Sequence, residues 1–282
     1  MRQSRRGILA GLSSAALAGP ALAAGVNPFE ALERKYGGRL GVYVYDTGSR
    51  RSLGWRQDER FSMCSTFKAL AVADVLARVD AGRERLDRRI AYGEKDLLEY
   101  APTTRAHVKD GALTLDALCA AAVELSDNTA ANLILAALGG PAEVTRFARS
   151  LGDPTTRLDR NEPTLNRPEG EHDTTTPSAY AHTMAKILLG DVLKPASRAK
   201  LEGWMHDETP GRDRVRKGLP ASWRSADKPG TGRTQTNDVV LARPPHRAPL
   251  LIGAYYESKD GGSAAAQALM QAVGRSVAKW AP

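Results

Sequence analysis

Apolar and polar positions along the chain fall into successive patterns. Residues 39–46 are rich in β-branched and aromatic side chains, and residues 52–55, after a Thr-Gly turn, can pair with them as a hairpin. From residue 65 to about residue 150, Ala and Leu recur at helical spacing, with breaks at Asp-Gly, Ser-Asp-Asn and Gly-Gly-Pro. The chain is therefore expected to begin as sheet and to continue as a block of helices.

The second half of the chain opens with a loop and returns to sheet. Residues 157–177 contain three prolines and many polar side chains without apolar periodicity, which predicts a long loop of the kind that often carries function. Helix is expected to resume near residue 177. Three strands and a final helix are expected after it, over 226–231, 239–242, 250–258 and 263–280.

This order of elements predicts two lobes, with one sheet assembled from both ends of the chain. We expect the sheet lobe to span about 25–56 and 208–282, and the helical lobe to span about 57–207. No internal repeat or low-complexity linker interrupts either part. The fold class that follows is α/β in the broad sense, that is, α+β.

Residues 1–24 have the composition of an export signal. Three arginines precede a mildly apolar run and a small Ala-Leu-Ala end, which predicts a cleavable signal peptide rather than an anchor. Arg5 and Arg6 lie just before the apolar run and look like a twin-arginine signal, so we expect folded export by the twin-arginine machinery to a bacterial periplasm. Later segments all fall short of about 18 uncharged apolar residues, so we expect a soluble mature chain with no membrane anchor.

Charge and cysteine content narrow the possible functions. The chain carries 40 Lys and Arg against 32 Asp and Glu, a net charge of +8, and loss of residues 1–24 would leave +5. The densest basic run, Arg78 to Arg89, is interleaved with acids and is interpreted as a solvated helix face, so no nucleic-acid partner is expected. Cys64 and Cys119 are too few for a disulfide framework or a thiolate metal cluster.

Candidate chemistry begins with Ser65 and Lys68. Their spacing at the start of a helical segment places a hydroxyl and an amine on one face of the first turn. The amine can then lie within hydrogen-bond reach of the hydroxyl and take its proton. Unpaired N–H groups at the start of a helix can also stabilise an oxyanion. Since the pattern fixes only two positions, a helix cap followed by a surface lysine is the alternative.

Three further stretches carry polar groups whose types and positions suit an active site. Residues 126–128 (Ser-Asp-Asn) interrupt the helical pattern, where a loop could project Ser126 and Asn128 into a cleft, or where they could simply cap the next helix. Residues 228–232 (Lys-Pro-Gly-Thr-Gly) place a lysine and small residues on an expected strand or, alternatively, in a turn. Residues 160–166 (Arg-Asn-Glu-Pro-Thr-Leu-Asn) lie in the long loop.

In this order and at these separations, the stretches resemble the motifs of the serine β-lactamase and penicillin-binding superfamily. Residues 160–166 resemble the omega loop of class A β-lactamases (R-x-E-x-x-L-N), which is not expected in the transpeptidases. Tyr100 looks like the aromatic residue at the edge of the cleft in that family. The resemblance runs from about Phe29 to the C-terminus, so the chain is identified as a member of the class A serine β-lactamases. It implies an antiparallel sheet flanked by helices, an all-helical lobe, and an active site between them.

The resemblance also implies the first chemical step. Ser65 would attack the β-lactam carbonyl, and the oxyanion would rest on the backbone N–H groups of Ser65 and Thr231. The proton of Ser65 would pass directly to Lys68, or to Glu162 through a water molecule, and the sequence leaves both routes open. The product of this step is an acyl-enzyme.

By the same resemblance, Ser126 would relay a proton to the departing ring nitrogen in the field of Lys68 and Lys228. Asn128 would bind the side-chain amide of the substrate. Glu162 and Asn166 would hold the water that hydrolyses the ester, with Glu162 as general base. The expected activity is hydrolysis of penicillin- and cephalosporin-type antibiotics, which gives resistance. We expect a monomer that needs no cofactor and no metal.

The chain departs from the family pattern at two places. Pro229 stands where the family has Thr or Ser, whose hydroxyl normally helps to hold the substrate carboxylate. Arg214 matches a position that supplies a cation for this carboxylate in part of the family, with an ordinary surface charge as the alternative. Arg160 is expected to pair with Asp173 and close the omega loop, although an exposed pair would contribute little. The loop also looks shorter than usual after Asn166.

Relatives with a disulfide would pair Cys64 and Cys119 with two other positions that are not cysteine here, so both thiols are expected to be free and buried. Other function classes are less consistent with the sequence. A D-Ala-D-Ala carboxypeptidase or penicillin-binding protein is disfavoured by Glu162, and a non-hydrolytic β-lactam sensor by the lack of an expected membrane tether. A Ser-His-Asp hydrolase lacks its G-x-S-x-G motif. A zinc lactamase is disfavoured because the five histidines are scattered.

Overall fold

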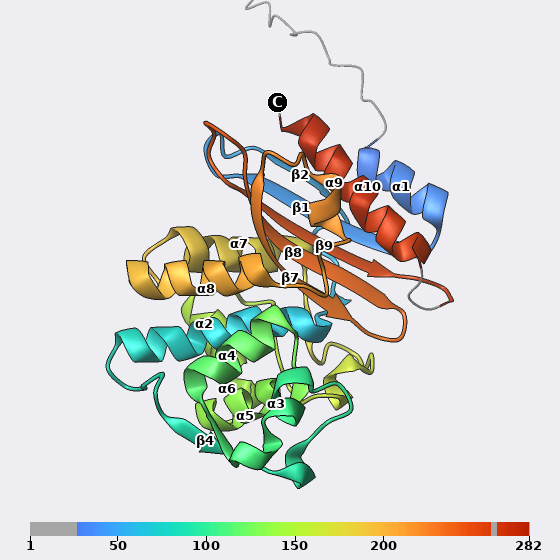
Figure 1. The fold of residues 1–282 in the computed structure, drawn as a ribbon. Coiled ribbons are helices and arrows are strands. Elements are labelled where there is room, and N and C mark those ends of the chain that lie inside the picture. Colours follow the sequence, from blue (N-terminus) through green and yellow to red (C-terminus); the bar gives the residue numbers. More distant parts are fainter. Residues whose placement is uncertain (1–26, 261–263, 282) are drawn as a thin grey trace, which may run out of the picture.

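The computed structural model describes residues 27–260 and 264–281, and the expected signal peptide lies outside them. Its centre is a five-stranded antiparallel sheet in the order β2-β1-β9-β8-β7, with both ends of the chain contributing strands (Figure 1). Strands β1 and β9 pair along their whole length, from Arg39 opposite Glu257 to Asp46 opposite Leu250. This confirms the predicted fold class. The strands are β1 (Arg39–Asp46), β2 (Ser52–Trp55), β7 (Arg224–Thr231), β8 (Gln235–Arg243) and β9 (Leu250–Glu257).

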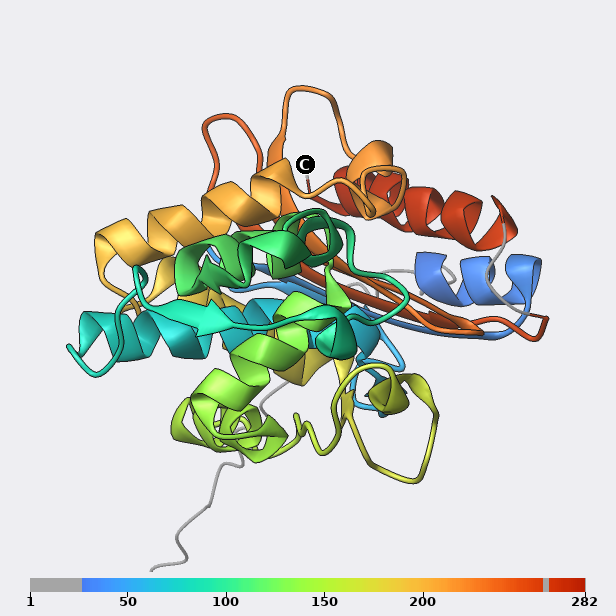
Figure 2. The same ribbon diagram turned by 60° about the horizontal axis from the view of Figure 1, so that its bottom comes forward.

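Helices cover both faces of the sheet. Helices α1 (Pro28–Tyr36) and α10 (Ala264–Trp280) lie side by side on one face, as Figure 2 shows. Helices α7 (Pro177–Leu189) and α8 (Pro195–Asp207) pack against strands on the other face. In Figure 1, the helices from the middle of the chain lie below these two. They are α2 (Phe67–Asp80), α3 (Pro102–Ala106), α4 (Leu115–Glu124), α5 (Asn128–Leu138) and α6 (Pro141–Ser150), while the short α9 (Val215–Gly218) packs against α10.

The strand sequences explain how the sheet can be covered on both faces. Side chains alternate between faces along a strand, so neighbours in β1 serve different cores. Leu40, Val42 and Val44 point into the cluster that includes residues of α1 and α10. Tyr43 points into the larger cluster on the other side. Because both faces are buried, β1 and β9 are apolar along most of their length.

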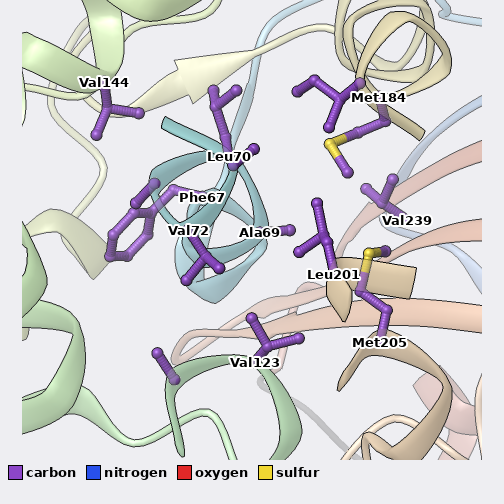
Figure 3. Packing of buried hydrophobic residues seen from close by; sticks show 14 of the residues in the cluster. Phe67, Ala69, Leu70, Val72, Val123, Val144, Met184, Leu201, Met205 and Val239 are labelled. Carbon is purple, nitrogen blue, oxygen red and sulfur yellow. The ribbon is translucent and has the colours of Figure 1, made fainter. Parts of the chain in front are cut away.

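Helix α2 is the centre of the larger core. Its residues from Phe67 to Leu76 are all buried, because small alanines alternate with larger apolar side chains around the whole helix. Figure 3 shows Val123, Val144, Met184 and Leu201 from other helices arranged around it. A helix that is enclosed in this way fixes the residues at its N-terminus, where Ser65 and Lys68 lie.

Two local predictions were wrong. The basic run from Arg78 to Arg89 is not a helix face, because α2 ends at Asp80 and Gly82 follows with φ +69°. A turn then leads into a small hairpin of β4 (Arg89–Ala91) and β5 (Ala112–Thr114), which the helical periodicity did not predict. A second pair, β3 (Phe61–Ser62) with β6 (Thr174–Thr175), joins the segment before α2 to the end of the long loop.

The prediction of free thiols is confirmed, since Cys64 and Cys119 are both buried and unpaired. Among the described residues, no helix combines the length and the apolar character that crossing a membrane requires.

Candidate active site

Ser65 lies in a single 3₁₀ turn (Cys64–Thr66) that leads directly into α2. The turn is held from two sides. Tyr180 donates from its hydroxyl to the Thr66 carbonyl at 2.5 Å, and Asn237 donates from Nδ2 to the carbonyls of Ser62 and Met63 at 2.9 and 3.1 Å. These buried hydrogen bonds fix the backbone on both sides of the Ser65 hydroxyl.

Lys68 is fully buried one turn further along. Its ammonium donates to the Ser126 carbonyl at 2.8 Å and to Asn128 Oδ1 at 2.6 Å, and lies 3.3 Å from Glu162 Oε1. A longer contact, at 3.4 Å, joins Lys68 to Ser126 Oγ, and no hydrogen bond joins Lys68 to Ser65 in the described structure. Ser65 Oγ instead donates to Glu162 Oε1 at 3.4 Å. The predicted contact between amine and hydroxyl is therefore replaced by a carboxylate that both groups reach.

Burial shifts the pKa values of both lysines in the site. It lowers the pKa of Lys68, although the nearby Glu162 carboxylate opposes the shift. Burial, together with the positive charge of Lys68, lowers the pKa of Lys228 to about 7. Lysines shifted in this direction release a proton more readily than lysines in water, which suits proton transfer at neutral pH.

The Ser126–Asn128 break has two structural roles. Asp127 caps α5 by accepting from the Ala130 N–H at 2.8 Å, so the capping alternative is correct for this residue. Ser126 and Asn128, on either side of it, line the cavity instead. Ser126 adopts a left-handed conformation (φ +57°), and its Oγ accepts from Lys228 Nζ at 3.0 Å. The break thus brings Ser126 between the two lysines.

Glu162 is fixed at both its backbone and its side chain. Asn132 accepts from the Glu162 N–H and donates to the Glu162 carbonyl, both at 2.9 Å. Asn166 donates to Glu162 Oε2 at 2.6 Å. No motif in the sequence includes Asn132. Its spacing of four residues from Asn128 could have indicated it, because this spacing places both side chains on the same face of α5.

The omega loop is closed by a buried contact. Arg160 Nε lies 2.6 Å from Asp173 Oδ2, and the Asp173 side chain is fully buried. Asp173 Oδ1 also accepts from the N–H groups of Asp159 and Arg160, at 2.7 and 2.9 Å. A buried ion pair with this many hydrogen bonds stabilises the loop more than the exposed pair considered above would.

Arg214 is buried, not a surface charge. Its guanidinium donates to the carbonyls of Gly230 and Asn237, at 2.9 and 2.7 Å, and to Thr231 Oγ1 at 2.6 Å. Pro229 lies in β7, an edge strand of the sheet, where its missing N–H is tolerated. Arg214 therefore lies beside the position at which the family's usual hydroxyl is absent.

One cavity of about 350 Å³ joins most of these side chains. Beneath its floor lie the buried side chains of Lys68, Glu162 and Lys228. Tyr100 stands at the edge of the cavity and is half exposed, while Arg160 and Asp173 do not line it. The lining residues are Ser65, Tyr100, Ser126, Asn128, Asn166, Pro210, Arg214, Pro229 and Thr231.

Comparison with known proteins agrees with this geometry. The sequence profile described as "Beta-lactamase enzyme family" matches residues 26–281. The chain belongs to the class A serine β-lactamases. It is similar to β-lactamase CTX-M-97 of Escherichia coli, with 45% identity over 234 residues that cover 82% of this chain and 80% of the relative.

Solved structures give the same family. A β-lactamase from Burkholderia vietnamiensis matches with a TM-score of 0.90 and 52% identity, covering 93% of this chain and 97% of that one. An ancestral class A β-lactamase matches with a TM-score of 0.87 and 53% identity, covering 89% and 97%. The class A family, its fold and its serine β-lactamase activity therefore apply to this chain.

Proposed function

We propose that this class A β-lactamase uses Ser65 as its nucleophile and hydrolyses the resulting ester with Glu162 as general base. The observation that carries the proposal is that Glu162 Oε1 lies within reach of both the Ser65 hydroxyl (3.4 Å) and the Lys68 ammonium (3.3 Å). The same carboxylate can then accept the serine proton during acylation, pass it to Lys68 once that lysine has given its own proton to Ser126, and accept a water proton during deacylation.

Lys68 supports this role by its charge. A buried carboxylate is costly unless it is paired and hydrogen-bonded, and Lys68 and Asn166 supply these partners to Glu162. Lys68 and Asn166 thereby hold the carboxylate in place beside the Ser65 hydroxyl. During acylation, the backbone N–H groups of Ser65 and Thr231 act as the oxyanion hole, because both residues line the same cavity.

Ser126 delivers the proton to the departing ring nitrogen. Its hydroxyl lies 3.0 Å from Lys228 Nζ and 3.4 Å from Lys68 Nζ, so either ammonium can replace the proton that the hydroxyl gives up. The lowered pKa values of both lysines favour this transfer. Asn128 lines the cavity next to Ser126 and binds the side-chain amide of the substrate.

The substrate carboxylate is bound by Thr231 with Arg214 and Lys228 behind it. Arg214 Nη2 donates to Thr231 Oγ1, so the hydroxyl hydrogen of Thr231 remains free to point into the cavity. Arg214 also brings positive charge to the place where Pro229 provides no hydroxyl. Tyr100 lines this penicillin- and cephalosporin-binding cleft, which lies between the sheet lobe (about 25–56 and 208–282) and the helical lobe (about 57–207).

We also propose that residues 1–24 act as a twin-arginine signal and that the mature chain works as a periplasmic monomer. The sequence around Arg5 and Arg6 supports this.

A carboxypeptidase or a non-hydrolytic sensor would acylate without fast ester hydrolysis. The discriminating experiment is turnover of a chromogenic cephalosporin by the purified mature chain, with Ser65→Ala as control. Many turnovers per molecule that are lost in Ser65→Ala support the proposal, and one equivalent of product per molecule would refute it.

A further inference from the structure

Behind the wall of the active-site cavity, three carboxyl side chains lie with no exposed surface. Glu208 directly follows α8, Asp227 precedes Lys228 in β7, and Asp238 lies in β8 opposite Pro229. None of them has a role in the mechanism above. A buried carboxylate is stable only with compensating partners, so the partners of each one decide its protonation state.

Glu208 and Asp227 contact each other. Both groups are fully buried and face the same point beside Gly211, and two carboxyl groups that share a buried site are not both charged, so one of them should carry a proton and donate it to the other. Gly211 makes room for the contact, because a Cβ on this residue would lie 2.7 Å from Asp227 Oδ2 and 3.0 Å from Glu208 Oε2. The Gly211 N–H donates to the Glu208 carboxyl at 2.8 Å.

The neighbours of the pair indicate which group holds the proton. Asp227 forms an ion pair with Arg216, which favours its charged form. Neither Asp227 oxygen accepts a well-aligned hydrogen bond from a nitrogen or hydroxyl donor within the described residues. Glu208 forms no ion pair there and receives only the Gly211 N–H. A protonated Glu208 would therefore supply the donor that Asp227 lacks.

The pair is connected to the cavity through the backbone. The segment from Glu208 to Arg214 contributes Pro210 and Arg214 to the cavity wall. Asp227 is adjacent in sequence to Lys228, whose ammonium contacts Ser126. We propose that Glu208 and Asp227 share one proton at neutral pH, and that this bond positions Arg214 by fastening the Glu208–Arg214 segment to β7. The positioning role rests on the carboxylate-binding function proposed for Arg214.

The electrostatics agree with this assignment. Burial, reinforced by the charge of Asp227, raises the pKa of Glu208 to about 8, and Lys228 partly opposes the shift. Burial also raises the pKa of Asp227, while Arg216 acts against it. The charged or titratable groups that interact with the pair are Lys228 from β7, Asp238 from β8, Arg216 from α9 and Tyr100 at the cavity edge, and Arg214 faces Asp238 beside them.

The proton can be detected through the pH dependence of stability. The pKa of Glu208 is higher in the folded chain (about 8) than its ordinary value of 4.5, so ionisation favours unfolding as pH rises between these values. A glutamine keeps the hydrogen-bond donor and cannot ionise. We expect the Tm of Glu208→Gln relative to wild type to increase by several degrees from about pH 5 to about pH 8 and then to level off.

Glu202, on α8 just before Glu208, is the matched control. Arg243 binds its carboxylate with two hydrogen bonds, at 2.8 and 2.7 Å, and lowers its pKa. The Tm difference between Glu202→Gln and wild type should therefore be constant from about pH 5 to about pH 8. A Glu208→Gln difference that is equally constant would show that Glu208 holds no proton and would overturn the proposal.

The positioning role has its own readout. Glu208→Leu removes the donor, so we expect KM for a penicillin to rise several-fold with a smaller change in kcat, whereas Glu208→Gln should keep KM within about twofold of wild type at pH 7. Equal KM values in the two variants would overturn the positioning role. The Tm measurement needs no substrate, so its failure is distinguishable from a failure of the proposed carboxylate site. It also stands if Glu208→Leu does not fold.

Discussion

Lys68 Nζ lies 3.3 Å from Glu162 Oε1, and both side chains are fully buried. The contact joins the first turn of α2 to the omega loop, two segments that are remote in sequence. It also joins an ammonium and a carboxylate whose side chains have no solvent-exposed surface. The loop is therefore fastened to the nucleophile's helix by the same two groups that we propose for proton transfer.

This contact predicts strong energetic coupling. Lys68→Met and Glu162→Gln each remove one partner and leave the other buried without it, so together they should cost less than the sum of the single changes. We expect a coupling of about 0.5–3 kcal/mol, measured by denaturant unfolding of the two single variants and the double variant. The exposed pair of Lys200 with Asp116 serves as a control, with a coupling of at most about 1 kcal/mol. Additive effects at Lys68 and Glu162 would show that the pair is not a unit.

Asn132 offers a test of how Glu162 is held. It has no place in the proposed chemistry, but it bonds both backbone groups of Glu162. Asn132→Ala should lower kcat by about tenfold or more, because misplacing a catalytic group by about 1 Å can cost about 10² in rate. Asn161→Ala, at an exposed position beside Glu162, is the control and should have little effect. If Asn132→Ala is fully folded and its kcat is unchanged, then Asn132 does not position Glu162 for catalysis.

Pro229 and Arg214 should act on the same substrate group. A hydrogen bond to a charged group contributes about 1.5–3 kcal/mol, so Pro229→Thr should raise kcat/KM for penicillins by up to about tenfold, at the low end of that range, because Arg214 and Lys228 already supply charge. Arg214→Ala should then reduce kcat/KM more in the Pro229 background than in the Pro229→Thr background. Steady-state kinetics of the single and double variants complete the cycle, and independent effects would mean that the two positions do not share the substrate carboxylate.

Export provides a separate prediction. Replacing Arg5 and Arg6 with Lys should leave the protein in the cytoplasm, because the apolar run that follows is only mildly hydrophobic. Fractionation followed by a β-lactamase assay measures this. Full periplasmic activity in the double variant would mean that the chain uses the general secretory route.

The sequence predicted the main elements because their hydrophobic patterns are long and regular. The expected strand over 39–46 and the final helix agree with β1 and α10. The hairpin of β4 and β5 escaped prediction because each strand has only three residues, too few for a recognisable alternation.

The contacts of charged side chains were harder to foresee. Arg214 donates hydrogen bonds to carbonyl groups that lie 16 and 23 residues further along the chain. No local sequence pattern indicates partners at such a distance. For the same reason, the sequence did not indicate that Lys68 would bind Ser126, Asn128 and Glu162 rather than Ser65. Glu208 and Asn132 went unnoticed because each acts on another residue of the site and belongs to no motif.

The most direct test of the central claim is intact-mass analysis of Glu162→Ala after mixing with a penicillin. Loss of a general base slows the attack of water by about 10²–10⁴-fold, so the ester on Ser65 should accumulate and persist while wild type returns to its free mass. Glu169→Gln, in the same loop but exposed, should behave as wild type. If Glu162→Ala shows no adduct and hydrolyses penicillin at the wild-type rate, then Glu162 is not the base and the proposed mechanism is wrong.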